Sequence, residues 1–164
     1  MIGEHREILF LTAEVSGAFL GFVGIVLVLG NRADGQLEIR DQTGLFHLIF
    51  TSVGALFGSL LMLISLSSFG ESRLVWRTGV GLISMYMAYG VIKAMLERKA
   101  DENRLSAVAM VLLTGGTWVV IGLNVAIVLG FIGEHAPLAY SLSVTYMIGV
   151  AVTYFVPLVL LRTR

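Results

Sequence analysis

The chain has 164 residues, of which 57% are hydrophobic and only 13% are charged, whereas a soluble domain has roughly 45–50% apolar and about 25% charged residues. The 11 Lys and Arg residues balance the 11 Asp and Glu residues, so there is no basic excess that could neutralise a nucleic-acid backbone. The absence of cysteine excludes disulfides, thiolate metal sites and iron–sulfur clusters. This composition indicates a membrane protein and excludes a nucleic-acid-binding one.

Five stretches of the sequence are long and apolar enough to cross a bilayer. A helix rises about 1.5 Å per residue, so about 20 residues cross the ~30 Å hydrocarbon layer. The connections between the stretches are short, which makes consecutive helices antiparallel neighbours. The sequence therefore predicts a single all-α domain over residues 1–164, a bundle of five transmembrane helices at about residues 8–30, 45–69, 74–96, 105–132 and 138–161.

The basic residues near the ends of these stretches predict the orientation. One side of the predicted bundle carries Arg6, Arg73 and Arg77, and the other side carries a larger set: Arg32, Arg40, Lys93, Arg98, Lys99, Arg104, Arg162 and Arg164. Lys and Arg are enriched in cytoplasmic loops. We therefore expect the N-terminus outside and the C-terminus inside the membrane, with the first stretch retained as a helix.

Small residues recur at helical spacing in the first stretch, where Ala13, Gly17, Gly21 and Gly24 form one stripe. Gly58 occupies a similar position in the second stretch. Small residues let helix backbones approach closely in lipid, both within a chain and between chains. The stripes therefore predict close helix packing, and they leave open whether the packing is within the bundle or between copies in a homo-oligomer.

Glu14 is the most unusual residue of the sequence because it is an acid inside a predicted span. It is placed about 10 Å below the outer surface by the helical rise, and an ionised side chain facing lipid there costs at least ~2.5 kcal/mol. Glu14 shares a helix face with Gly17 and Gly21, so we expect it to face protein. It is interpreted either as an ion or proton site or as a structural carboxyl that holds two helices together.

Four other polar residues are predicted at a depth comparable to that of Glu14. They are Arg77 in the third span, Asn124 in the fourth, and Thr145 and Tyr146 in the fifth. In the site hypothesis, Asn124, Thr145 and Tyr146 are secondary ligands, and Arg77 favours the ionised carboxylate. The alternatives are a dry structural network and an Arg77 side chain that extends to the membrane surface.

Two further residues are candidates for a gate or a pH sensor. Pro157 lies near the end of the fifth span, where it removes a backbone hydrogen bond, and His47 lies near the start of the second span, with an imidazole that titrates near neutral pH. Each also has a simpler interpretation, as a tolerated helix-end proline and a hydrogen-bonded interfacial histidine. The sequence contains no zinc motif, Walker A sequence or nucleophile elbow, so we expect neither metal nor cofactor.

The first span carries a resemblance to known proteins. The run AEVSGAFLGFVG at residues 13–24, followed by LGNR at 29–32, resembles the first helix of small, uncharacterised bacterial multi-pass membrane proteins. The resemblance covers this helix alone. It implies a bacterial inner-membrane protein and carries no activity.

Two functional hypotheses follow from these observations. The first is a homo-oligomeric channel-like or transport protein for a proton or a small cation, with Glu14 as the exchanging group. The second is a non-catalytic accessory or scaffold subunit of a larger membrane complex, with Glu14 in a structural polar network. An enzyme is not expected, because no second catalytic acid, histidine or metal cluster accompanies Glu14. The expected partners are the lipid bilayer, further copies of the chain and other membrane subunits.

Overall fold

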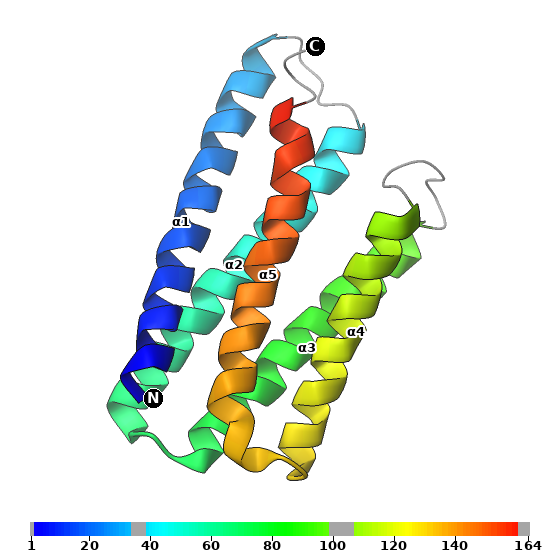
Figure 1. Cartoon of the computed structure of the whole chain (residues 1–164). Coiled ribbons are helices and arrows are strands. Elements are labelled where there is room, and N and C mark those ends of the chain that lie inside the picture. The colour runs from blue at the N-terminus through cyan, green and yellow to red at the C-terminus, as the bar shows by residue number, and fades with distance from the viewer. Residues whose placement is uncertain (1, 34–38, 99–106, 161–164) are drawn as a thin grey trace.

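The computed structural model describes the backbone of residues 2–33, 39–98 and 107–160, and the side chains of residues 4–25, 44–96 and 113–156. Within these ranges the chain consists of helices joined by short turns, and the long helices run alternately up and down (Figure 1). The helices are α1 (Ile2–Ala33), α2 (Ile39–Phe69), α3 (Arg73–Arg98), α4 (Ala107–Leu129), the short 3-10 helix η1 (Gly133–His135) and α5 (Ala136–Leu160).

The prediction of an all-α chain with five long helices is confirmed, but several helices extend beyond the predicted apolar stretches. Helix α1 begins at Ile2 and α2 begins at Ile39, in each case several residues earlier than expected. The reason is that hydropathy marks the part of a helix that lies in hydrocarbon, whereas a helix with charged residues at its end continues into water. Hydropathy therefore predicted where the membrane spans lie but underestimated the lengths of these two helices.

Four of the helices contain continuous segments that are long and apolar enough to cross a membrane: Glu4–Ile25, Gly44–Phe69, Arg73–Leu96 and Gly133–Val156. Helix α4 is apolar over its described segment Leu113–Leu129. Large apolar side chains such as Met85 and Val119 are each 73% exposed, and a soluble monomer rarely exposes apolar surface over so wide an area. The chain is an integral membrane protein with several spans, whose outer surface contacts lipid.

Glycines end two of the helices. Gly130 follows α4 with a φ of +94°, a conformation that glycine adopts without steric cost. The backbone N–H of Phe131 donates to Ala126, and that of Gly130 donates to Ile127, at 3.0 Å each; these two hydrogen bonds form a Schellman motif. Gly70 follows α2 with a φ of +71°. Both turns lie at the lower end of the bundle, which we define as the end that holds the N-terminus, Gly70 and η1 (Figure 1).

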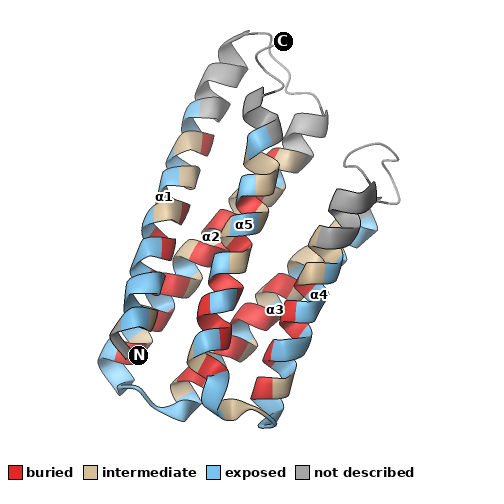
Figure 2. Ribbon diagram, viewed as in Figure 1, coloured by how far each residue is buried: buried red, intermediate tan, exposed pale blue. Residues whose placement is uncertain are grey.

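Helix α5 lies at the centre of the arrangement, because its backbone packs against all four other long helices. Helix α1 packs against α2 and α5, and α4 packs against α3 and α5. Buried residues accordingly line the inner faces of the helices, and exposed residues line the outer faces (Figure 2). Helix α1 therefore lies at one edge of the bundle, with an outer face that no other described helix covers.

The buried faces of α1 and α2 carry small side chains. On α1 they are Thr12, Ala13 and Ser16, and on α2 they are Ser52, Ala55 and Ser59. Small side chains allow the closer backbone approach on which helix association in lipid depends. Larger apolar residues fill the remaining core, among them Leu9, Leu66, Ile83, Ile127 and Val144.

Candidate functional site

Glu14 lies on the outer face of α1, and its side chain is exposed. The inward face of this helix is defined by Leu9, Ser16 and Val23, which are all buried and recur every seven residues. Glu14 is two positions away from Ser16, which is a rotation of about 200° around the helix. The carboxyl group therefore points away from the bundle.

The glycines that follow Glu14 share this outward orientation. A Cβ atom added at Gly17, Gly21 or Gly24 would meet no described atom within 4 Å other than the neighbouring backbone of α1 itself. The sequence analysis left open whether the α1 glycines pack within the bundle or between copies. In the single chain, these glycines and Glu14 do not pack within the bundle. Ala13, at the start of the predicted stripe, lies instead on the buried face.

Gly58 has a different environment from the α1 glycines. A Cβ atom at Gly58 would lie 3.1 Å from Ile83 Cδ1 and 3.4 Å from Tyr140 Oη. The Tyr140 hydroxyl donates a hydrogen bond of 2.7 Å to the backbone carbonyl of Gly58. Gly58 thus lies in a close contact among α2, α3 and α5.

Glu14 lies inside the membrane span of α1. The described apolar segment Glu4–Ile25 contains it, and the apolar residues begin at Ile8, after the charged residues at 4–7. The six residues from Ile8 to Glu14 correspond to about 9 Å along the helix, which is about a third of a ~30 Å hydrocarbon layer. Glu14 therefore lies within the hydrocarbon, as the sequence predicted, where an ionised carboxylate that faces lipid is costly.

The four residues predicted to accompany Glu14 lie on other helices. Among the described residues, the α1 backbone packs against neither α3, which carries Arg77, nor α4, which carries Asn124. Tyr146 faces α4 from α5, and Thr145 is exposed. The prediction of one polar cluster around Glu14 is therefore not met within a single chain, because depth along a helix does not reveal which helices are neighbours.

Asn124 and Tyr146 instead link α4 to α5 through hydrogen bonds. Asn124 is fully buried, and its Nδ2 donates to Ser143 Oγ at 2.9 Å. The Tyr146 hydroxyl donates to the Leu113 carbonyl at 2.8 Å and lies 3.2 Å from Thr117 Oγ1. Side-chain hydrogen bonds of this kind hold transmembrane helices together. Asn124 Oδ1 has no hydrogen-bond partner in the described structure.

Arg77 satisfies the backbone at the end of α4. Its guanidinium donates to the carbonyl of Val128, and its Nη2 lies 3.4 Å from the position of a Cβ atom at Gly130. The last carbonyls of a helix lack intrahelical partners, and basic side chains near a helix C-terminus commonly satisfy them. Arg77 therefore neither reaches Glu14 nor extends freely to the surface.

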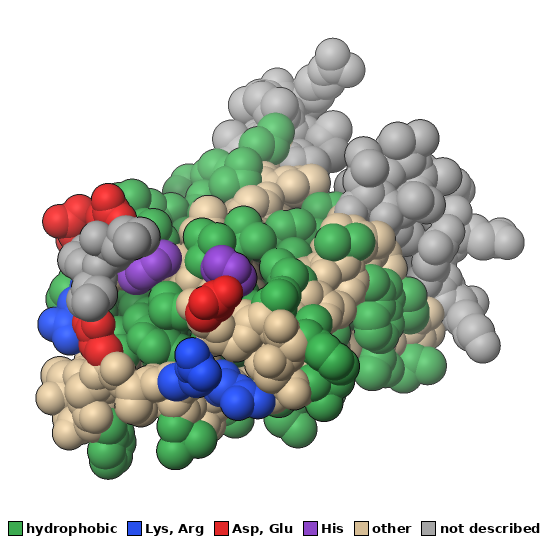
Figure 3. Space-filling model, turned by 60° about the horizontal axis from the view of Figure 1, so that its bottom comes forward, with side chains coloured by type: hydrophobic (Ala, Val, Ile, Leu, Met, Phe, Trp, Pro, Cys, Tyr) green, Lys and Arg blue, Asp and Glu red, His purple; other side chains and the backbone are tan. Residues whose placement is uncertain are grey.

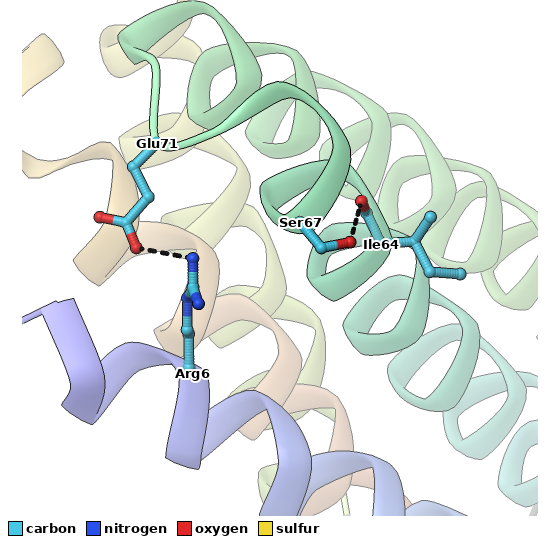
Figure 4. Close-up of polar contacts among 4 residues, drawn as sticks. All are labelled: Arg6, Ile64, Ser67 and Glu71. Carbon is cyan, nitrogen blue, oxygen red and sulfur yellow. Dashed lines mark hydrogen bonds and ion pairs between the residues drawn. The ribbon is translucent and has the colours of Figure 1, made fainter.

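The lower end of the bundle carries charged and histidine side chains among apolar ones (Figure 3). Arg6 pairs with Glu71 at 3.2 Å, which ties α1 to the α2–α3 connection (Figure 4). Ser67 donates to the Ile64 carbonyl at 2.8 Å in the same view. His5 Nδ1 lies 3.2 Å from Ser141 Oγ, and the His5 ring meets Trp76 edge-on.

His47 lies at the opposite, upper end, where the C-terminus is also found. Its imidazole stacks on the ring of Tyr154 with 5.0 Å between centroids. Both residues line a cavity of about 80 Å³ among α2, α3, α4 and α5. The backbone of α5 remains helical through Pro157 to Leu160, while the side chain of Pro157 lies outside the described residues. The roles of His47 and Pro157 as gate or pH sensor stay predictions.

Within the described residues, no group of three or more His, Asp or Glu side chains gathers that could hold a metal ion. Comparison with known proteins gives no match to a protein family, to a curated protein or to a solved structure. The resemblance of the first helix to bacterial membrane proteins therefore stays a prediction.

Proposed function

We propose that this protein is a homo-oligomeric, channel-like or transport protein for a proton or a small cation, with Glu14 as the group that exchanges the ion. The observation that carries the proposal is the position of Glu14, which is exposed on the outer face of α1 within its apolar segment. We place the protein in a bacterial inner membrane with the N-terminus outside, and we assign it no enzymatic activity.

The position of Glu14 favours assembly through α1. A charged side chain that faces lipid at the bilayer centre costs at least ~2.5 kcal/mol, and such residues usually face protein or a water-filled cavity. Gly17 and Gly21 form a G-x-x-x-G pair on the open side of α1, and this spacing is typical of transmembrane helix association. Contact between α1 helices of two copies would remove the carboxyl groups from lipid.

The chemistry of such an interface favours a proton or a cation. Among the described basic residues, Arg73, Arg77 and Lys93 lie on α3, which the α1 backbone does not contact, and Arg6 pairs with Glu71. In a homo-oligomer, the group that meets one Glu14 is then another Glu14. Two carboxylates at close range cannot both remain ionised without a counter-ion, so they would hold a proton or a cation between them.

The test is ion flux through liposomes that contain the purified protein, compared with a Glu14→Gln variant. Glu7→Gln is the matched control, because Glu7 is seven residues earlier on the same exposed face but lies near the end of the span. We expect proton or monovalent-cation flux in the wild type and in Glu7→Gln, and a loss of at least tenfold in Glu14→Gln. Size-exclusion profiles verify that all three proteins are folded.

The competing proposal is an accessory or scaffold subunit of a larger membrane complex. The same open face of α1 supports it, because a different membrane protein could cover Glu14. A polar network around Glu14 is no longer part of this alternative, since the single chain does not bring one together. Absence of flux in wild-type liposomes, combined with a monomeric purified protein, would reject the channel proposal in favour of the accessory one.

A further inference from the structure

A groove opens between α2 and α3, on the side of the bundle away from α1. Its volume is about 830 Å³. Helices α2 and α3 flank it, and Tyr140 of α5 also lines it; the lining is mostly apolar and includes Phe57, Leu61, Phe69 and Leu82. All of these four side chains are exposed, so the groove is open on the outer surface of the bundle. No pattern in the sequence predicts this groove, because it results from the way α2 and α3 lie against α5.

The length of the groove matches one leaflet of a bilayer. Along α3 its lining residues extend from Leu74 to Tyr86, which is about 18 Å at 1.5 Å per residue. Half of a hydrocarbon layer is ~15 Å thick. The groove therefore starts at the lower end of the bundle, at the membrane surface, and reaches slightly beyond the bilayer centre.

The surface end of the groove has an exposed basic residue beside it. Arg73 lies between the lining residues Ser72 and Leu74, its side chain is exposed, and among the described residues it has no ion-pair partner. The nearby acid, Glu71, is already paired with Arg6. Ser65, Ser72 and Thr78 add hydroxyl groups to the lining, which is otherwise apolar.

We propose that this groove binds an anionic glycerophospholipid, with an acyl chain along α2 and α3 and the phosphate beside Arg73. An open groove between membrane spans is filled by hydrocarbon rather than by water, because apolar walls offer water no hydrogen bonds. The positive charge at the surface end selects the headgroup, since a basic residue near the surface attracts anionic lipid. The proposal does not depend on Glu14 or on ion transport.

The test measures lipid binding by native mass spectrometry of the delipidated protein titrated with phosphatidylglycerol or phosphatidylcholine. We expect tighter binding of phosphatidylglycerol, and about a fivefold loss of that preference in Arg73→Gln, as expected for removing one basic residue at the membrane surface. Lys93→Gln is the matched control, because it removes a basic residue at the other end of α3. It should leave the preference unchanged.

A second variant tests the groove itself. Thr78 is exposed and lines the groove, so Thr78→Trp should fill it and lower the affinity for both lipids. Free glycerol phosphate, which carries the headgroup without acyl chains, should not compete. The proposal would be overturned if the wild type bound the two lipids equally, or if glycerol phosphate competed. It would also be overturned if the Thr78→Trp protein kept its lipid but no longer formed an oligomer. The last result would assign the groove to a second copy of the chain.

Discussion

Glu14 and Arg77 are both ionisable residues within membrane spans, and the described part of the chain provides a partner for only one of them. Arg77 donates a hydrogen bond to the Val128 carbonyl at the end of α4, which satisfies both the guanidinium donor and the carbonyl. Glu14 is exposed on α1, and no described residue pairs with it. This contrast at the level of single residues separates a structural charge from a candidate functional one.

The role of Arg77 gives a prediction about stability. Arg77→Met removes the donor to Val128, which costs about 0.5–1.5 kcal/mol, the net contribution of a typical hydrogen bond. We expect a lower Tm of the protein in detergent, measured by circular dichroism. Arg73→Gln is the control, because Arg73 has no ion pair among the described residues and its loss should leave Tm unchanged. Equal effects of the two variants would contradict the structural role of Arg77.

At the scale of the helices, the two kinds of glycine in this bundle have different consequences. A Cβ atom at Gly54 of α2 would lie 2.2 Å from Tyr86 Cε1 and 2.3 Å from Met147 Cε, so α2 has no room for a side chain there. At Gly21 of α1 the same atom would meet nothing within 4 Å. Glycine is therefore needed for packing within the chain at Gly54, and its use at Gly21 has to be explained by contacts outside the chain.

This difference predicts opposite outcomes for two matched substitutions. Gly54→Ala should destabilise the fold by about 1–3 kcal/mol, because overpacking forces neighbouring side chains to move. Gly21→Ala should leave the fold intact or slightly stabilise it, because alanine favours the helix more than glycine does. Thermal unfolding in detergent measures both. A loss of stability in Gly21→Ala under conditions where the protein is monomeric would show that α1 packs differently from the structure described above.

At the scale of the whole molecule, the position of α1 at the edge of the bundle determines where copies can meet. Helix α5 packs against all four other long helices, whereas among the described residues α1 contacts only α2 and α5 along its backbone. Helix α1 presents Glu14, Ala18 and Gly21 to its surroundings. A second chain can therefore reach Glu14 without any rearrangement of the first. The α2–α3 groove lies elsewhere on the surface, so lipid binding and assembly can be tested separately.

The absence of cysteine makes the proposed interface directly testable by cross-linking. In membranes, Ala18→Cys should form a disulfide-linked dimer, because Ala18 lies beside Glu14 and Gly21 on the outer face of α1. Leu82→Cys is the control, since Leu82 is 63% exposed but lies on α3. Non-reducing electrophoresis after mild oxidation measures the products. Dimers from Leu82→Cys but not from Ala18→Cys would place the interface between copies on α3. This result would contradict the proposal, because Glu14 on α1 would then remain outside the interface.

Much of the fold could be predicted from the sequence, but the candidate site could be predicted only in part. Apolar runs of about 20 residues indicated the helices, and Glu14 was conspicuous as an acid within one of them. Its orientation was not predictable, because both faces of α1 carry small and apolar residues: Ala13 and Ser16 are buried, while Ala18 and Gly21 are exposed. In water a buried face is distinguished by its hydrophobicity, but in lipid both faces are apolar.

The sequence by itself determined that the chain is helical and crosses a membrane several times, because every backbone polar group in hydrocarbon must be paired internally and long apolar runs do this as helices. The tertiary structure decided which helices are neighbours. It separated Glu14 from Arg77 and Asn124, gave Arg77 a partner on α4, and opened the groove between α2 and α3. The reason is that helix neighbours in lipid are chosen by the shapes of their surfaces, which no single helix sequence reveals.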